Sequence, residues 1–425
     1  MRKLFIYIAV IIANLFFLSK NLYANHVVGA ELTYRCLGGN LYEFTLIVYI
    51  DCAVGGSLSG TQNDVSICSP NCGIRLENIF ELNQIGGDVE VSPVCASDLP
   101  NTTCATPPGT LAGIKKQVYR NTFTMPADCD DWYIFMNLGG RSSIVDNLDV
   151  GGSAPTFHIY TELNNALPGG CDNNSPTFTN EPIRFICAGN EWCYDHGINP
   201  DPDGDSIVYS LIAAMTKTNC SKGCSPVVCT ADTATYLSGP GSPPGCLGTH
   251  SYSSTYPMGT LSGSFPFDNS TGFIGCMTPD SCQAGMGFEM VVKATEYRDT
   301  SGNGDWVKTG SVVRDMVVNM LDCSGGNSNP PEIPNGIDTN VIGGAWIDST
   351  TVEVCGGNTI TFTMEVDDPV EDDDVIVTSS FPAITGTGTF SPTTYEDPDF
   401  TATFTWATTL ADTGFYTFGV TVTDD

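Results

Sequence analysis

The chain has 425 residues and a formal net charge of −32, because 48 Asp and Glu stand against 16 Lys and Arg. This charge repels phosphate and excludes nucleic acid as a partner. With 45 Gly, 26 Pro and only 15% charged residues, the composition also excludes a bundle of long helices. The length predicts two to four domains.

The first 24 residues have the pattern of a secretory signal peptide. Arg2 and Lys3 precede an apolar run from Leu4 to Leu18, which is shorter than the ~20 residues of a membrane span. A polar stretch follows and ends in Ala24, after which we expect cleavage. No later stretch is long and apolar enough to cross a membrane, so we expect a mature chain without a membrane span. Its expected location is outside the cell or on the outer cell surface.

The 18 cysteines are disulfide candidates, because exported proteins fold in an oxidising compartment. They are Cys36, Cys52, Cys68, Cys72, Cys95, Cys104, Cys129, Cys171, Cys187, Cys193, Cys220, Cys224, Cys229, Cys246, Cys276, Cys282, Cys323 and Cys355. Zinc binding is disfavoured, because the closely spaced Cys220, Cys224 and Cys229 lack a second matching pair. The sequence does not give the pairing. Cys355 stands alone near the C-terminus, so it would bridge a domain boundary or pair with a cysteine beyond Asp425.

Short β-rich runs recur along the chain, with Gly, Pro, Asn and Asp between them. Examples are 42–50, 117–125, 156–161, 288–293 and 359–366. Outside the signal peptide, no window keeps the period of about 3.6 residues that an amphipathic helix needs. The predicted fold class is therefore all-β, with disulfide-bonded tandem β-sandwich modules of an Ig-like, PKD-like or cadherin-like kind.

Two stretches rich in turn-forming residues, 169–176 and 324–331, are expected to be linkers. They divide the mature chain into an N-terminal β domain over 25–170, a sandwich over 176–323 and another over 330–425. The last run of the chain has the pattern of a closing strand, and we expect the protein to continue with further domains. The second and third modules look like weak copies, because each has an acidic loop that leads into a strand.

The acidic loops are the candidate metal sites. Carboxylates that alternate along a loop can converge on Ca²⁺, which takes about six to eight oxygen ligands. The candidate calcium ligands are Asp201, Asp203, Asp205, Asp299, Asp367, Asp368 and Asp372. The loop from Asp201 is not an EF-hand, because Gly and Glu are missing from the positions that this motif requires. The alternative is a set of solvated turns that the Asp side chains cap.

Catalytic motifs are absent from the sequence. It has no nucleophile elbow, phosphate-binding loop, dinucleotide fingerprint or H-E-x-x-H motif. With 48 acidic residues, no single pair can be assigned to glycoside hydrolysis. The candidates for stacking on sugars are Trp132, Tyr133, Trp192, Trp306 and Trp346, although such residues in β modules are more typical of the core. We therefore predict a protein that is not an enzyme.

One run, from His26 to Cys52 (HVVGAELTYRCLGGNLYEFTLIVYIDC), resembles the start of large secreted surface proteins of Bacteroidetes. The similarity covers about 26–323 and continues in CDDW (129–132), NSPTFTN (174–180), HG (196–197), DPDGDSIVYSL (201–211), EYR (296–298) and RD (314–315). The resemblance implies PKD or Ig-like repeats and a gliding-motility-associated C-terminal domain for type IX secretion. That domain would lie beyond Asp425.

Together these features predict a non-enzymatic extracellular or cell-surface protein that presents tandem β modules like an adhesin, with a link to surface adhesion or gliding. Its modules would form a rod that Ca²⁺ stiffens. The expected partner is an unidentified cell-surface protein or polysaccharide. The alternative is a set of accessory carbohydrate-binding modules in a secreted catabolic enzyme, whose catalytic domain would lie beyond residue 425.

Overall fold

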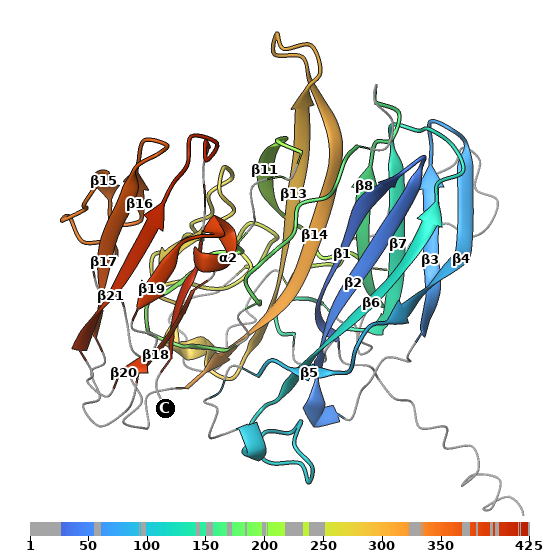
Figure 1. Cartoon of the computed structure of the whole chain (residues 1–425). Coiled ribbons are helices and arrows are strands. Elements are labelled where there is room, and N and C mark those ends of the chain that lie inside the picture. The colour runs from blue at the N-terminus through green and yellow to red at the C-terminus, as the bar shows by residue number, and fades with distance from the viewer. Residues whose placement is uncertain are drawn as a thin grey trace, which may run out of the picture.

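The computed structural model describes most of the chain (Figure 1). The described residues are 27–54, 61–92, 94, 99–141, 145–149, 156–167, 172–182, 185–197, 201, 203–216, 233–237, 251–322, 333, 335–367, 375–379, 381–391, 394–395, 399–414, 416 and 418–423. The expected signal peptide, 1–24, lies outside them. Antiparallel strands dominate, and the only α-helix among these residues is the one-turn α2 (Phe381–Thr385). The predicted all-β class is confirmed.

The largest sheet has twelve strands. They are β1 (Val27–Gly38), β2 (Leu41–Asp51), β3 (Thr61–Ser69), β4 (Ile74–Gln84), β5 (Val89–Glu90), β6 (Ile114–Thr124), β7 (Trp132–Gly140), β8 (Thr156–Leu163), β9 (Phe185–Cys187), β11 (Ser206–Ile212), β13 (Gly287–Asp299) and β14 (Trp306–Leu321). The order β1-β2-β6-β4-β3-β7-β8-β14 returns to β1, because β14 pairs with both β8 and β1. These eight strands therefore form a closed ring around one core. Outside the ring, β5 pairs with β6, β9 and β13 pair with β14, and β11 pairs with β13.

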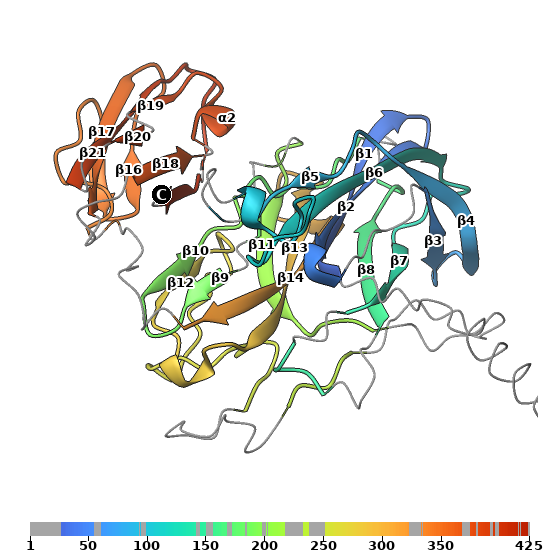
Figure 2. The same ribbon diagram turned by 90° about the horizontal axis from the view of Figure 1, so that it is seen from below.

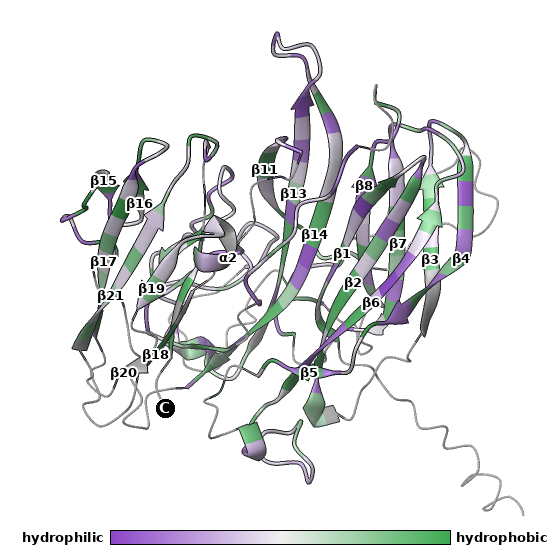
Figure 3. Cartoon of the chain, viewed as in Figure 1, coloured by the Kyte–Doolittle hydropathy of each residue, from purple (hydrophilic) through white to green (hydrophobic). Residues whose placement is uncertain are grey.

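The alternation of side chains along the strands explains this core. In β2, Tyr42, Phe44, Leu46 and Val48 are buried, while the residues between them are only partly buried. Successive side chains of a strand point to opposite faces, so one face of β2 lines the ring and the other faces outward. Figure 3 shows the corresponding alternation of hydrophobic and hydrophilic residues along the strands.

The long strand β14 joins parts of the chain that the sequence placed in separate modules. One edge of β14 pairs with β13 over Gly287–Asp299. Strands β8, β1 and the parallel β9 pair with it in turn at residues 310–312, 314–316 and 319–321 (Figure 2). Ten consecutive residues, 309–318, are buried, because other strands and side chains cover both faces. We expected a domain boundary between 25–170 and 176–323, but in the structure strands from both ranges pair within one continuous sheet.

The expected linker at 169–176 also differs from the structure in its described part, 172–176. Asn173 and Ser175 are buried, and Ser175 exchanges hydrogen bonds with the backbone of Tyr34 in β1. Asn174 Oδ1 accepts from the backbone N–H of Cys36. These polar side chains satisfy the part of the β1 edge that β14 does not reach. The composition that suggested a flexible boundary thus belongs to a segment that packs along a strand.

The C-terminal part, over the described residues of 333–423, forms its own sheets. Its strands are β15 (Ala345–Asp348), β16 (Thr351–Glu353), β17 (Thr359–Asp367), β18 (Val375–Ser379), β19 (Thr389–Ser391), β20 (Thr394–Tyr395), β21 (Asp399–Ala407) and β22 (Val420–Thr423). Sheets β17-β21-β19 and β20-β18-β22 share one apolar core around Phe362, Phe381 and Phe404. Among the described residues, no strand of this part pairs with the large sheet.

Disulfides join distant segments of the chain. Three link described residues: Cys52–Cys104, Cys72–Cys129 and Cys193–Cys276. The last ties β10 (Trp192–Tyr194) to β12 (Ile274–Met277), which also pair as a small sheet. Cys36, Cys68, Cys187 and Cys282 are disulfide-bonded as well. Cys355 is an exposed free thiol. The remaining candidates, Cys95, Cys171, Cys220, Cys224, Cys229, Cys246 and Cys323, lie outside the described residues.

Candidate functional site: a buried carboxylate cluster

The loop before β11 is shaped by its own first aspartate. Asp201 Oδ1 accepts the backbone N–H groups of Asp203 at 2.8 Å and Asp205 at 3.1 Å. Gly204 has a φ of +78°, which favours glycine, and its N–H donates to the carbonyl of Asp201. This local network is the capped turn expected as the alternative to a metal loop, but it occupies only one of the two Asp201 carboxylate oxygens.

Strand pairing brings this loop beside the long hairpin. In the register of β11 and β13, Ile207 lies opposite Glu296. Asp205 accepts hydrogen bonds from Arg298 of β13, through Nε at 2.5 Å and Nη2 at 3.0 Å. Thr309 of β14 also donates to Asp205, at 2.8 Å. Both strands of the hairpin therefore hold the Asp205 carboxylate in place.

Glu296 completes the cluster from β13. It is fully buried, and its Oε2 accepts hydrogen bonds from Tyr34 Oη at 3.2 Å and Asn173 Nδ2 at 3.3 Å. Glu296 Oε1 has no hydrogen-bond donor, and the same is true of Asp201 Oδ2. Burial raises the pKa of Glu296 well above its usual range, and the neighbouring Asp201 carboxylate raises it further.

Oxygens of Asp201, Asp205 and Glu296 lie within 4.8 Å of one another. Within the described part of the chain, this is the one group of three or more His, Cys, Asp or Glu side chains close enough to share a metal ion. The structure thus brings together two of the predicted ligands, Asp201 and Asp205, with one residue that the prediction missed.

Asp203 lies in the same loop, but its carboxylate is not in this group. Both of its oxygens accept from Asn174, one from the backbone N–H and one from the side-chain amide. Burial raises the pKa of Asp203. Its contacts connect the loop to the 172–176 segment.

The other predicted calcium ligands are dispersed. Asp299 is at the exposed end of β13, where it accepts hydrogen bonds from the backbone of Ser301, Gly302 and Gly304. These donors lower the pKa of Asp299. Asp367 is the last residue of β17 and pairs with Asp399. Asp368 and Asp372 lie outside the described residues.

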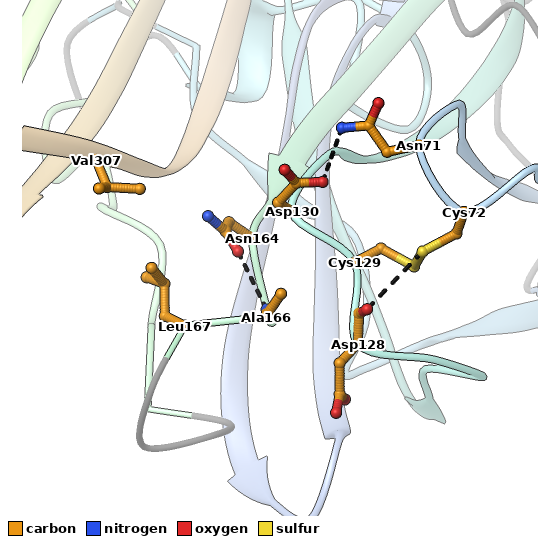
Figure 4. A pocket seen from close by; sticks show the side chains of 9 residues that line it. All are labelled: Asn71, Cys72, Asp128, Cys129, Asp130, Asn164, Ala166, Leu167 and Val307. Carbon is orange, nitrogen blue, oxygen red and sulfur yellow. Dashed lines mark hydrogen bonds between the residues drawn. A yellow bond between two sulfur atoms is a disulfide. The ribbon is translucent and has the colours of Figure 1, made fainter.

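A separate surface pocket of about 500 Å³ lies beside the Cys72–Cys129 disulfide (Figure 4). Its lining residues are Asn71, Cys72, Asp128, Cys129, Asp130, Asn164, Ala166, Leu167 and Val307. Figure 4 shows amide and carboxylate groups on the disulfide side, where Asn71 donates to Asp130, and the apolar Leu167 and Val307 on the opposite side. The pocket therefore combines hydrogen-bonding groups with a small apolar wall.

The tryptophans divide into two groups. Trp132, Trp192 and Trp406 are buried, as is Tyr133, which is expected of core residues in β modules, whereas Trp306 and Trp346 are exposed. Trp346 lies in the small β15–β16 hairpin, and Trp306 is the first residue of β14. Of the five tryptophans, all of them described, only these two therefore present a large indole surface to solvent.

No protein-family model, curated protein or solved structure matches this chain. Over the residues that the structure describes, no helix has the length and apolar character needed to span a membrane.

Proposed function

We propose that the chain is a non-enzymatic extracellular or cell-surface protein of the adhesin type, which presents binding surface on the large closed sheet and on an Ig-like or PKD-like C-terminal module. The observation that carries this proposal is the β13–β14 hairpin. Its turn end rises above the neighbouring strands, while residues 310–316 of β14 are built into the closed ring (Figure 1). An exposed element on a rigid base is suited to contact with a partner.

The disulfides support the extracellular location, because such bonds persist in oxidising compartments. The signal-peptide pattern of residues 1–24 supports it independently. The resemblance to secreted surface proteins of Bacteroidetes supports a role in adhesion or gliding and export by type IX secretion. These three arguments come from separate features of the chain.

The expected partner is a polysaccharide or protein of a cell surface. Trp306 is 57% exposed and lies opposite Asp299 where the hairpin turns. An exposed indole offers a flat apolar face for a sugar ring or a protein side chain, and Trp is prominent among residues that dominate binding energy. The residues between the strands, 300–305, are exposed and polar or Gly.

Binding of the labelled full chain to intact cells and to polysaccharide-coated surfaces tests this proposal. We expect the wild type to bind at least one of these surfaces and the Trp306→Ala variant to lose most of that binding. Leu410→Ala is the matched control, because Leu410 is an apolar residue that is 85% exposed in the C-terminal part. Equal binding by wild type and Trp306→Ala, or no binding by wild type to either surface, would contradict the proposal.

The surface pocket beside the Cys72–Cys129 disulfide favours a second candidate function, that of carbohydrate-binding modules accessory to a secreted catabolic enzyme. Asn and Asp side chains are suited to sugar hydroxyl groups, and the pocket has both beside an apolar wall. Calorimetric binding of soluble oligosaccharides that Asn71→Ala abolishes and Trp306→Ala preserves would favour this candidate over the first.

A further inference from the structure

Two buried carboxylate oxygens in the cluster lack any hydrogen-bond donor. They are Glu296 Oε1 and Asp201 Oδ2, and Glu296 has no exposed surface at all. A buried acceptor without a donor is costly, and two ionised carboxylates close together also repel each other. We propose that Asp201, Asp205 and Glu296 bind one Ca²⁺ ion near the turn end of the β13–β14 hairpin, where Glu296 lies three residues before the end of β13.

The negative charge around the cluster favours the binding of a cation. Asp201, Asp203, Asp205 and Glu296 contribute four carboxylates, and among the described residues only the basic side chain of Arg298 forms an ion pair with them. Arg298 also pairs with Asp172, at 3.1 Å, so its charge is shared further. A divalent ion offsets this excess of negative charge more fully than a single proton held between Glu296 and Asp201.

Each of the three carboxylates is oriented by contacts that leave coordination capacity free. Backbone N–H groups hold Asp201 Oδ1 and leave Oδ2 open. Tyr34 and Asn173 hold Glu296 Oε2 and leave Oε1 open. Asp205 accepts three hydrogen bonds, while a carboxylate has about four acceptor positions. Such outer contacts fix the ligands of a metal before it binds.

The donor set selects the ion. All three ligands are carboxylates on a loop and a strand, without the nitrogen or sulfur ligands that zinc prefers. Mg²⁺ demands near-octahedral geometry with short bonds, whereas Ca²⁺ accepts irregular sets of oxygen ligands at about 2.3–2.6 Å. Water supplies the remaining ligands.

The bound ion would connect the 201–205 loop directly to β13. Through Tyr34 and Asn173, it would also connect the hairpin to β1 and to the 172–176 segment. The ion would therefore fix the part of the hairpin from which its turn protrudes. The proposal does not depend on the proposed adhesive function, because it rests on the contacts of the cluster alone.

Calorimetric titration of the metal-stripped full chain with CaCl₂ tests the site. We expect stoichiometric binding by the wild type, which Asp201→Asn and Glu296→Gln abolish. Asn173→Ala, which removes an outer contact, should weaken it by roughly tenfold or more. Asp299→Asn is the matched control, because Asp299 is a predicted ligand outside the cluster, and we expect it to bind like the wild type.

Thermal melts and terbium luminescence provide two further measurements, which separate loss of calcium binding from loss of stability in a variant. Ca²⁺ should raise the melting temperature of the wild type and leave that of Glu296→Gln unchanged. Tb³⁺ bound in the cluster should show emission sensitised by the nearby Tyr34, and Tyr34→Phe should reduce it. Calcium binding that survives both Asp201→Asn and Glu296→Gln would overturn the proposal. So would the absence of binding by the wild type, which would leave a shared proton between Glu296 and Asp201.

Discussion

Arg314 of β14 lies directly opposite Glu31 of β1, and the two form a fully buried ion pair. Arg314 donates to Glu31 Oε2 through Nε at 3.0 Å and Nη2 at 2.8 Å. Its guanidinium also lies over the ring of Phe178, with 4.1 Å between Cζ and the ring centroid. The pair sits where β14 closes the ring of strands, between residues that are 283 positions apart in the chain.

Replacing Glu31 by Ala should therefore destabilise the closed ring strongly. The change leaves the Arg314 charge buried without its partner, which typically costs about 3–5 kcal/mol in the free energy of unfolding. Urea denaturation measures the loss. The control is Arg35→Ala, which removes the exposed pair with Glu43 and should cost no more than about 1 kcal/mol. Similar losses in both variants would refute the central role of the buried pair.

Stability should also depend on pH through Glu162, which lies between Lys293 and Lys308 at 2.6 Å from each ammonium group. Burial alone would raise its pKa, but the two lysines lower the pKa from 4.5 to about 2. Because the folded-state pKa lies below the unfolded value, the ion pairs stabilise the folded state above about pH 4.5. This stabilisation is lost as the pH falls from about 4.5 towards 2.

Glu162→Gln should consequently lower the free energy of unfolding at pH 7 by an amount on the order of 2 kcal/mol, after allowance for partial solvent exposure. The difference from the wild type should shrink between pH 4.5 and pH 3. Denaturant titrations across this range measure it, with Glu81→Gln as a control at an exposed carboxylate. A difference that stays constant down to pH 3 would count against the assignment.

The Cys193–Cys276 disulfide closes a span of 83 residues and ties β10 to β12. Changing both cysteines to Ser should lower the free energy of unfolding by about 2–5 kcal/mol, because the unfolded chain gains conformational freedom. Guanidinium denaturation measures this change. Cys355→Ser is the control, since Cys355 is an exposed free thiol, and it should leave stability unchanged.

The C-terminal part should respond to core changes on its own. Phe404 is buried in its aromatic core and stacks on Phe362, with 5.2 Å between the ring centroids. Phe404→Ala should cost about 3–5 kcal/mol through lost contacts and the cavity left behind. Hydrogen exchange should accelerate within 333–423 and remain unchanged in β13 and β14. Faster exchange throughout the large sheet would show that the two parts unfold together.

The strands themselves were accessible from the sequence, because alternation of side chains is a local pattern. The runs predicted at 42–50 and 359–366 match β2 and β17 within one residue at each end. The run at 117–125 starts three residues inside β6 and ends one residue beyond it. The pairing of β1 with β14 was not accessible, because the alternation along a strand does not identify its partner. The division of the chain before 176 was drawn from composition, and it overlooked this long-range pairing.

The candidate site could be predicted only in part, because local sequence patterns show some of its residues and long-range pairing supplies the others. The D-P-D-G-D run drew attention to Asp201 and Asp205. Glu296 was not predicted as a ligand, because its position beside the loop follows from the register of β11 and β13, which the sequence does not show. The hydrogen bonds between Asp203 and Asn174 could not be predicted either, because Asn174 lies in a segment that we expected to be a linker.

The extracellular claim is tested most directly by the thiol state of the native chain. The chain should be recovered from the culture medium or from the surface of intact cells, alkylated without reduction, and mapped by mass spectrometry. We expect alkylation of Cys355 and protection of the ten cysteines known to be disulfide-bonded. A chain found only inside the cells, with Cys52, Cys104, Cys193 and Cys276 alkylated, would contradict an extracellular, disulfide-bonded scaffold.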